Sequence, residues 1–171
     1  NYPIDDPLDY HAIFYENPLI RRMIHTIDMV RQEETEAWVH IGIGGSIIPT
    51  KAMVNPSISA YHNDLSKEKR GGAPKIYWIG DSFSEDKVYE LLEALDSQGI
   101  LFKTKYNVIS KSGTTAETIS AFLMIKSWLE IRLQELNKAY NEGRIAEDAL
   151  IEQGLTIADI THITDENGKP Y

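Results

Sequence analysis

The hydrophobic positions of this chain fall into two alternating patterns. Short, nearly continuous apolar runs occur at residues 37–43, 75–79, 106–109 and 160–164. Such runs are typical of strands buried on both faces of a parallel sheet. Between them, apolar residues recur every three or four positions, which is the spacing of one helix face. The pattern therefore predicts four strands separated by helices.

Four helices are predicted in positions that fit this alternation. Asn17-Pro18 supplies an N-cap and a first helical residue for a helix that ends near 33–34. A short helix covers about 47–53, and a third follows the capping box of Ser82 and Glu85. A long fourth helix begins after Thr114. The apolar faces of the first, third and fourth helices comprise Ile20, Met23, Ile24, Ile27 and Val30; Val88, Leu91, Leu92 and Leu95; and Ile119, Phe122, Leu123, Leu129, Leu133 and Leu136.

The remaining segments carry weaker signals. Residues 1–9 are rich in proline and aspartate and predict an arm with little regular structure. Residues 55–74 are polar and predict a surface excursion with a solvated charged patch. Residues 137–154 are charged and helix-prone, with a weak apolar stripe at Ala146, Leu150 and Ile151.

The segment from Ser110 to Thr115 is the main candidate for chemistry. It leads from the strand at 106–109 directly into a helix, and Thr114 with Glu117 predicts a capping box at the helix start. Free backbone amides and the positive end of the helix dipole favour an anion at such a turn. Four hydroxyl groups and Lys111 add donors, so phosphate is favoured over a carboxylate. A cap that binds no ligand is the plain alternative.

A second loop of similar composition follows the first strand, at Gly42–Ser46. Alternating strands and helices predict an α/β fold, a three-layer sandwich with a central parallel sheet. In such sheets, ligands bind beyond the carboxyl ends of the strands, near a switch in strand order. If the strands at 37–43 and 106–109 are neighbours, both loops face one crevice.

Composition narrows the classes of partner. The 171-residue chain has 42% hydrophobic and 25% charged residues, as expected of one domain with a full core. Its net charge of −9 argues against nucleic acid or an anionic membrane surface. The chain has no cysteine, hence no disulfide or thiolate metal site, and no apolar run approaches the about 18 residues of a membrane span.

Rival motifs fit less well. Gly42-x-Gly44 would need a third glycine at position 47 to form a dinucleotide fingerprint, and Ile47 is there. No Gly-Lys-Ser/Thr triplet of a P-loop is present, and the histidines lack metal-type spacing. His40, inside a predicted strand, is expected to be a packed core residue. His162 and Asp165 could form an acid/base pair, although a turn after a strand explains them equally well.

Both loops resemble those of a known family. Ile41-Gly42-Ile43-Gly44-Gly45-Ser46 and Ile109-Ser110-Lys111-Ser112-Gly113-Thr114-Thr115-Ala116-Glu117-Thr118 each look like loops of sugar-isomerase (SIS) domains. Together, with Trp78-Ile79-Gly80-Asp81 between them and Thr164-Asp165 after them, they resemble bacterial glucose-6-phosphate isomerase. The resemblance covers about 37–135 and 160–165. Ile47-Ile48-Pro49 departs from the family's usual Leu-Gly, and 137–159 is longer than usual.

The resemblance implies a function and a set of site residues. The family interconverts glucose 6-phosphate and fructose 6-phosphate without a cofactor or metal, and the full-length enzyme is expected to be a cytoplasmic homo-oligomer, a dimer. No catalytic residue of the family matches a position in this chain, so the catalytic base is expected outside it. By this resemblance, the substrate-binding residues are Gly45, Ser46, Ser110, Lys111, Ser112, Gly113, Thr114 and Thr115.

The predicted domain layout follows. Residues 1–36 form an N-terminal arm and helix, and 37–171 form an SIS-type sugar-phosphate-binding subdomain, a portion of a longer enzyme. The alternatives are a stand-alone SIS-domain sensor of sugar phosphates and another ketose/aldose phosphate isomerase. A sensor should carry a partner-binding or DNA-binding segment, and the acidic arm offers none.

Overall fold

The computed structural model describes residues 17–32, 35–80 and 85–161. The chain separates into two compact units, Asn1–Thr35 and Glu36–Tyr171. In the first unit, helix α2 (Pro18–Gln32) begins at the predicted residue. The backbone amide of Leu19 donates to Oδ1 of Asn17 at 2.9 Å, so the asparagine caps the first turn. None of the helices in the described ranges combines the length and apolar character that crossing a membrane requires.

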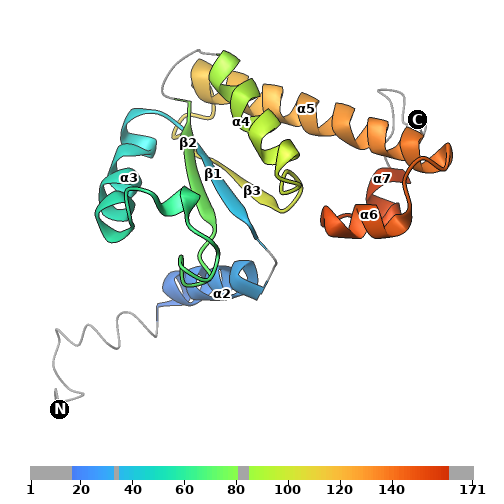
Figure 1. Cartoon of the computed structure of the whole chain (residues 1–171). Helices are drawn as coiled ribbons and strands as arrows, with labels where there is room; N and C mark the ends of the chain where they lie inside the picture. Colours follow the sequence, from blue (N-terminus) through green and yellow to red (C-terminus); the bar gives the residue numbers. More distant parts are fainter. Residues whose placement is uncertain (1–16, 33–34, 81–84, 162–171) are drawn as a thin grey trace, which may run out of the picture. The chain divides into compact units, whose positions relative to one another are not determined.

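The described residues of the second unit include a parallel sheet of three strands in the order β2-β1-β3 (Figure 1). The strands are β1 (Ala37–Ile41), β2 (Lys75–Ile79) and β3 (Thr104–Val108). The α/β class and the first three predicted strands are confirmed, with ends that differ by two residues at most. Since β1 is the central strand, it is paired on both edges.

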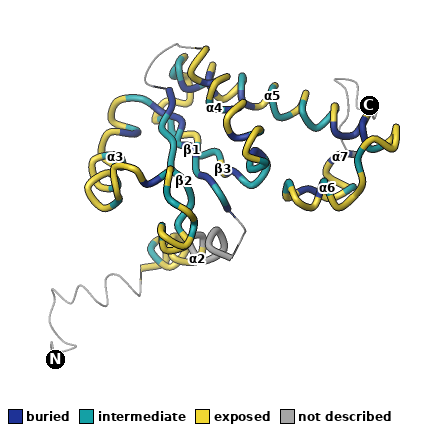
Figure 2. Tube along the Cα trace, viewed as in Figure 1, coloured by how far each residue is buried: buried dark blue, intermediate teal, exposed yellow. Residues whose placement is uncertain are grey.

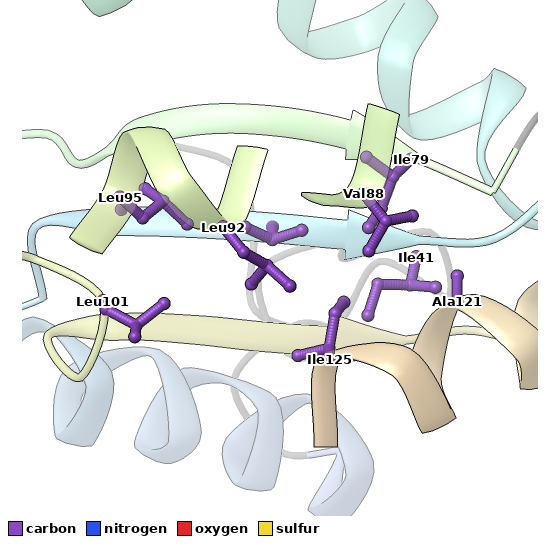
Figure 3. Close-up of a cluster of buried hydrophobic side chains, with 10 residues drawn as sticks. Ile41, Ile79, Val88, Leu92, Leu95, Leu101, Ala121 and Ile125 are labelled. Atoms are coloured by element: carbon purple, nitrogen blue, oxygen red, sulfur yellow. The ribbon is translucent and has the colours of Figure 1, made fainter. Parts of the chain in front are cut away.

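Two helices cover one face of this sheet and enclose the main core. Strand alternation places Ala37, Val39 and Ile41 on that face, and all three are fully buried. Helices α4 (Glu85–Ser97) and α5 (Ala116–Asn141) pack against them (Figure 3). Each fully buried valine, leucine or isoleucine side chain contributes about 1.5–3 kcal/mol. The cluster also contains Ile79, Val88, Leu92, Leu95, Leu101, Ala121 and Ile125.

The predicted inner face of α5 is confirmed at Leu129 and Leu133, which pack against the two cores, and is wrong near the start of the helix. Phe122 and Leu123 are 41% and 54% exposed, whereas Thr118, Ala121 and Ile125 are buried. Apolar residues occur on every side of this helix, so their spacing alone does not define the inner face. The small side chain of Ala121 lets the helix approach the sheet closely. Leu136, also predicted for the inner face, is buried farther along the helix.

The free edge of β2 is closed by a side chain. Nδ2 of Asn63 donates to the Ile76 carbonyl at 2.8 Å, and the Ile76 amide donates to Oδ1 of Asn63 at 2.8 Å. Asn63 lies in the short helix η3 (His62–Asp64), within the segment 55–74, which begins with the short helix η2 (Asn55–Ser57). An unpaired strand edge is a template for pairing with another chain. The asparagine amide satisfies both backbone groups at this point.

The sequence predicted that the charges of the same segment are solvated, but two of its cations have specific partners. Nζ of Lys67 forms an ion pair with Oε1 of Glu36 at 2.6 Å. The Arg70 guanidinium donates to the carbonyls of Leu65 and Ala73. The segment is therefore held by its own cations, a role that composition did not reveal.

The end of the described chain is helical. Helices α6 (Glu147–Glu152) and α7 (Ile157–Thr161) follow α5. The predicted strand at 160–164 is therefore wrong for its first two residues, and the others lie outside the described residues. The reason is a capping box, because the Thr156 amide donates to Oδ2 of Asp159 at 2.7 Å and the Asp159 amide donates back to Oγ1 of Thr156 at 3.4 Å.

These helices form a second small core with the end of α5. Its members are Leu136, Leu150, Leu155 and Ile160. Of the predicted stripe in 137–154, Leu150 is fully buried while Ile151 is 57% exposed.

Candidate functional site

The two candidate loops lie side by side at the carboxyl ends of the strands. The chain moves from the central strand β1 to β2 on one side and then to β3 on the other. The switch in strand order therefore falls between β1 and β3, where α/β sheets bind ligands. The Ile109 amide donates to the Ile41 carbonyl at 2.8 Å and joins the starts of the two loops. The condition for both loops to face one crevice, that these two strands are neighbours, is therefore met.

Two glycines allow the strand ends to meet this closely. A Cβ on Gly42 would lie 3.1 Å from the Ile109 carbonyl oxygen and 3.5 Å from Cβ of Ser46. Gly80, which follows β2, has φ of +101° and lies against the backbone of Gly42. A Cβ there would be 3.0 Å from the Gly42 nitrogen and oxygen, so a larger residue would be both strained and crowded.

The first loop is a single turn of 3₁₀ helix, η1 (Gly44–Ser46). The Ser46 amide donates to the Ile43 carbonyl at 3.1 Å. Gly45 is exposed and Ser46 is half-buried. Helix α3 (Ile48–Val54) follows with Pro49 in its first turn, as predicted, and buries none of its residues (Figure 2).

The second loop is held by its own hydroxyl groups. Oγ of Ser110 accepts from the Gly113 amide at 3.0 Å and lies 3.1 Å from Oγ1 of Thr115. Oγ of Ser112 accepts from the amide of Thr114 at 3.2 Å and from its hydroxyl at 3.0 Å. Gly113 has φ of +69°, which gives the loop its sharp turn. An anion at the Gly113 and Thr114 amides would have to replace two local hydrogen bonds.

The predicted capping box at the start of α5 is wrong. The N-cap is Thr115, with φ of −67° and ψ of 112°, and no side chain caps the helix there. The amide and hydroxyl of Thr114 are used by Ser112 instead. The amides of Ala116 and Glu117 lie in the first turn and have no carbonyl partner within the helix. They point, with the positive end of the helix dipole, toward the loop.

The electrostatic setting of the loop comes from few charges. Lys111 is exposed, and Glu117 is half-buried in the first turn of α5. In the part of the chain that the structure describes, no three His, Asp or Glu side chains are grouped as a metal site requires. The arrangement of amides, hydroxyls and one ammonium group suits recognition of a compact anion.

Sequence reasoning missed two features close to the loops. Thr118 in α5 is 1% exposed, and its hydroxyl has no hydrogen-bond partner among the described residues. His40 was expected in the core and is half-buried between Trp38 and Trp78, and its Nδ1 lies 3.1 Å from Nδ2 of Asn107. Burial lowers the pKa of the His40 imidazole. The contacts with Trp78 and Asn107 follow from the register between strands, which the sequence does not show.

Other candidates lie elsewhere. A cavity of about 420 Å³ runs along α5, remote in sequence from both loops, and is lined by Gln134, Asn137, Lys138, Asn141 and Glu142. Ser82, His162 and Asp165 lie outside the described residues.

The fold and the paired loops define a class: α/β domains in which two glycine- and hydroxyl-rich loops meet at the switch point of a parallel sheet. No family model matches the chain. It is 36% identical to glucose-6-phosphate isomerase from Symbiobacterium thermophilum over 118 residues, 69% of this chain and 25% of the relative. The enzyme of the same name from Acetivibrio thermocellus is 38% identical over 58% of the chain and 21% of the relative. The one from Pediococcus pentosaceus is 33% identical over 75% of the chain and 26% of the relative.

The chain is thus related to one part of glucose-6-phosphate isomerase, and the resemblance inferred from its two loops is confirmed. It spans about a quarter of the length of the curated relatives it matches. Because these relatives are named as isomerases, a stand-alone sensor is not favoured.

Proposed function

We propose that this chain is the phosphate-holding part of a glucose-6-phosphate isomerase, which interconverts glucose 6-phosphate and fructose 6-phosphate. The observation that carries the proposal is the position of the two loops. They follow neighbouring strands at the switch point and are joined by the Ile109–Ile41 hydrogen bond. The relatives' name supplies the identity of the reaction.

The two loops take different parts of the substrate in this proposal. Amides and hydroxyls between Ser110 and Thr115, with Lys111, bind the phosphate, because the loop and the start of α5 provide several donors at one point. Gly45 and Ser46 approach the sugar. Gly45 has no side chain and is exposed, so its backbone is open to a ligand.

Holding the phosphate contributes positioning rather than chemistry. Isomerisation needs a base that moves a carbon-bound proton and a group that stabilises the enediolate. The phosphate is remote from that carbon, so its binding lowers the barrier only when the reacting groups are also fixed. We propose that those groups lie outside this chain, in a longer cytoplasmic enzyme that has two SIS-type subdomains, forms a homodimer and requires no cofactor.

Charge reversal in the second loop tests the phosphate assignment. Ser112→Asp places a negative charge beside the bound anion and should weaken binding of fructose 6-phosphate by more than tenfold. Thr115→Val keeps the shape but removes one hydroxyl, and should cost about 1–2 kcal/mol, as for a hydrogen bond to a charged group. Titration calorimetry with fructose 6-phosphate and with inorganic phosphate measures both effects.

Ser127→Asp is the matched control, because Ser127 is exposed on α5 far along the helix from the loop. It adds the same charge to the protein and should leave the affinity within about twofold, since exposed charges beyond a Debye length are screened. Equal affinity for wild type and Ser112→Asp would refute the phosphate assignment.

A further inference from the structure

One side chain contacts all three strands on the face of the sheet opposite the main core. The His40 ring, on β1, stacks on Trp38 of the same strand at 5.6 Å between centroids and on Trp78 of β2 at 4.6 Å. Its Nδ1 lies 3.1 Å from Nδ2 of Asn107, on β3. His40 pairs in register with Trp78 on one side and with Asn107 on the other. The imidazole is therefore fixed by an aromatic contact on one side and a polar contact on the other.

This contact lies directly beneath the two loops. His40 is two positions before Gly42, where the first loop begins, and Asn107 is three positions before Ser110. The next link between the same two strands is the Ile109–Ile41 backbone hydrogen bond, from which both loops depart. β1 and β3 are paired over five residues only. The hydrogen bond between the side chains of His40 and Asn107 therefore adds a further link between the two strands near the loops.

The chemistry of the pair fixes the proton positions. An asparagine Nδ2 only donates, so Nδ1 of His40 accepts and its Nε2 carries the proton. A neutral ring is required for this bond, and burial favours the neutral form by lowering the pKa of His40. Leucine in place of Asn107, or phenylalanine in place of His40, would have a similar shape but a larger volume and would lose the bond.

We propose that His40 and Asn107 are positioning residues that hold the Gly42–Ser46 and Ser110–Thr115 loops at the spacing one sugar phosphate requires. The inference rests on the proposed function of those loops. Neither side chain contacts the ligand. They act by fixing β3 against β1, so that the donors of the two loops face the same anion without reordering.

Four variants of the 171-residue chain separate positioning from general stability. Asn107→Leu and His40→Phe should each raise the Kd for inorganic phosphate and for fructose 6-phosphate about fivefold, the factor expected for one lost hydrogen bond. His40→Gln retains an acceptor for Asn107 and should restore part of the affinity. Asn63→Ala is the control, because it removes two hydrogen bonds at the β2 edge, on the side of the sheet away from β3. It should lower Tm yet keep Kd within twofold.

Amide hydrogen exchange gives a readout that needs no ligand. In Asn107→Leu, the Ile109 amide should exchange about fivefold faster, in line with one lost hydrogen bond, while the Val39 amide in the middle of β1 keeps its rate. Unchanged Kd in Asn107→Leu, or an equal loss of affinity in Asn63→Ala, would overturn the proposal. Failure of the wild-type chain to bind either ligand would instead overturn the proposed function, and the exchange rates would then decide whether the pair fixes the strands.

Discussion

Thr118 carries a buried hydroxyl that the fold leaves without compensation. The residue is 1% exposed on the inner side of α5, and no described residue bonds its Oγ1. Burying a hydroxyl without a partner costs about 1–3 kcal/mol. Its β-branched shape, in contrast, fits beside Ala121 and the strand ends. Shape and polarity therefore act in opposite directions at this position.

Replacing Thr118 by valine should stabilise the chain by about 1 kcal/mol, because the shape is kept and the unpaired hydroxyl is removed. Urea unfolding followed by circular dichroism measures the change in the midpoint at constant slope. Thr115→Val is the comparison, since its hydroxyl bonds Ser110 at 3.1 Å and its loss should not stabilise. A decrease in stability of Thr118→Val would show that the hydroxyl bonds an ordered water.

At the scale of secondary structure, strands were more predictable than helix faces. The runs at β1 and β2 are short and nearly all apolar, so their position and type followed directly. Helix α5 has apolar residues on all sides, including exposed Leu123 and Ile131. Which of them faces inward depends on the contact with the sheet, and that contact is not encoded in the spacing of one helix.

A matched pair of substitutions tests the assignment of the α5 face. Ile125→Ala should destabilise by about 2–5 kcal/mol, because it leaves a cavity against the sheet. Leu123→Ala, two positions earlier and 54% exposed, should change stability by at most about 0.5 kcal/mol. The reverse order of these effects, measured by urea unfolding, would mean that the predicted face was right.

Two capping patterns in this chain show that a local sequence pattern does not determine its hydrogen bonds without the neighbouring residues. Thr114-x-x-Glu117 and Thr156-x-x-Asp159 have the same form, yet only the second makes reciprocal bonds. In the first, Ser112 lies close enough to take both the amide and the hydroxyl of Thr114. The competing partner is itself part of the candidate site, so the same hydroxyls that suit an anion also displace the cap.

At the scale of the whole chain, the sequence could predict each loop of the candidate site separately, but not that the two loops lie together. The composition of each loop indicated an anion, and the strand order that brings them together was an expectation until the sheet was known. The roles of the eight substrate-binding residues remain a prediction. What sequence could not supply was the set of contacts across strands, such as His40 with Asn107, since they depend on register.

The 171 residues alone should not isomerise glucose 6-phosphate. They carry the proposed phosphate loop, but a placed base and an enediolate stabiliser would each contribute about 100-fold or more, and both are proposed to lie outside the chain. The measurement is fructose 6-phosphate formation by the purified chain beside a complete glucose-6-phosphate isomerase. Turnover within about tenfold of the complete enzyme would contradict the expectation.

Glu117 provides the decisive control for that assay. With no capping role, its carboxylate is available in the first turn of α5 beside the proposed phosphate site. If the chain is active, Glu117→Gln shows whether this group is the base. Loss of that activity in the variant, at unchanged phosphate affinity, would show that Glu117 is the catalytic base and that the base lies within this chain.

The two hydrogen bonds between the Asn63 side chain and Ile76 of β2 have a consequence for folding while the chain is being synthesised. Both partners of β2, the central strand β1 and the Asn63 amide, precede it in the sequence. When β2 leaves the ribosome, β1 is therefore already present to pair with its inner edge, and Asn63 is present to bond Ile76 on its outer edge. β1 is in the opposite position, because one of its edges stays open until β3 has been made. The nascent chain is thus exposed to wrong pairing along β1 until β3 has been translated.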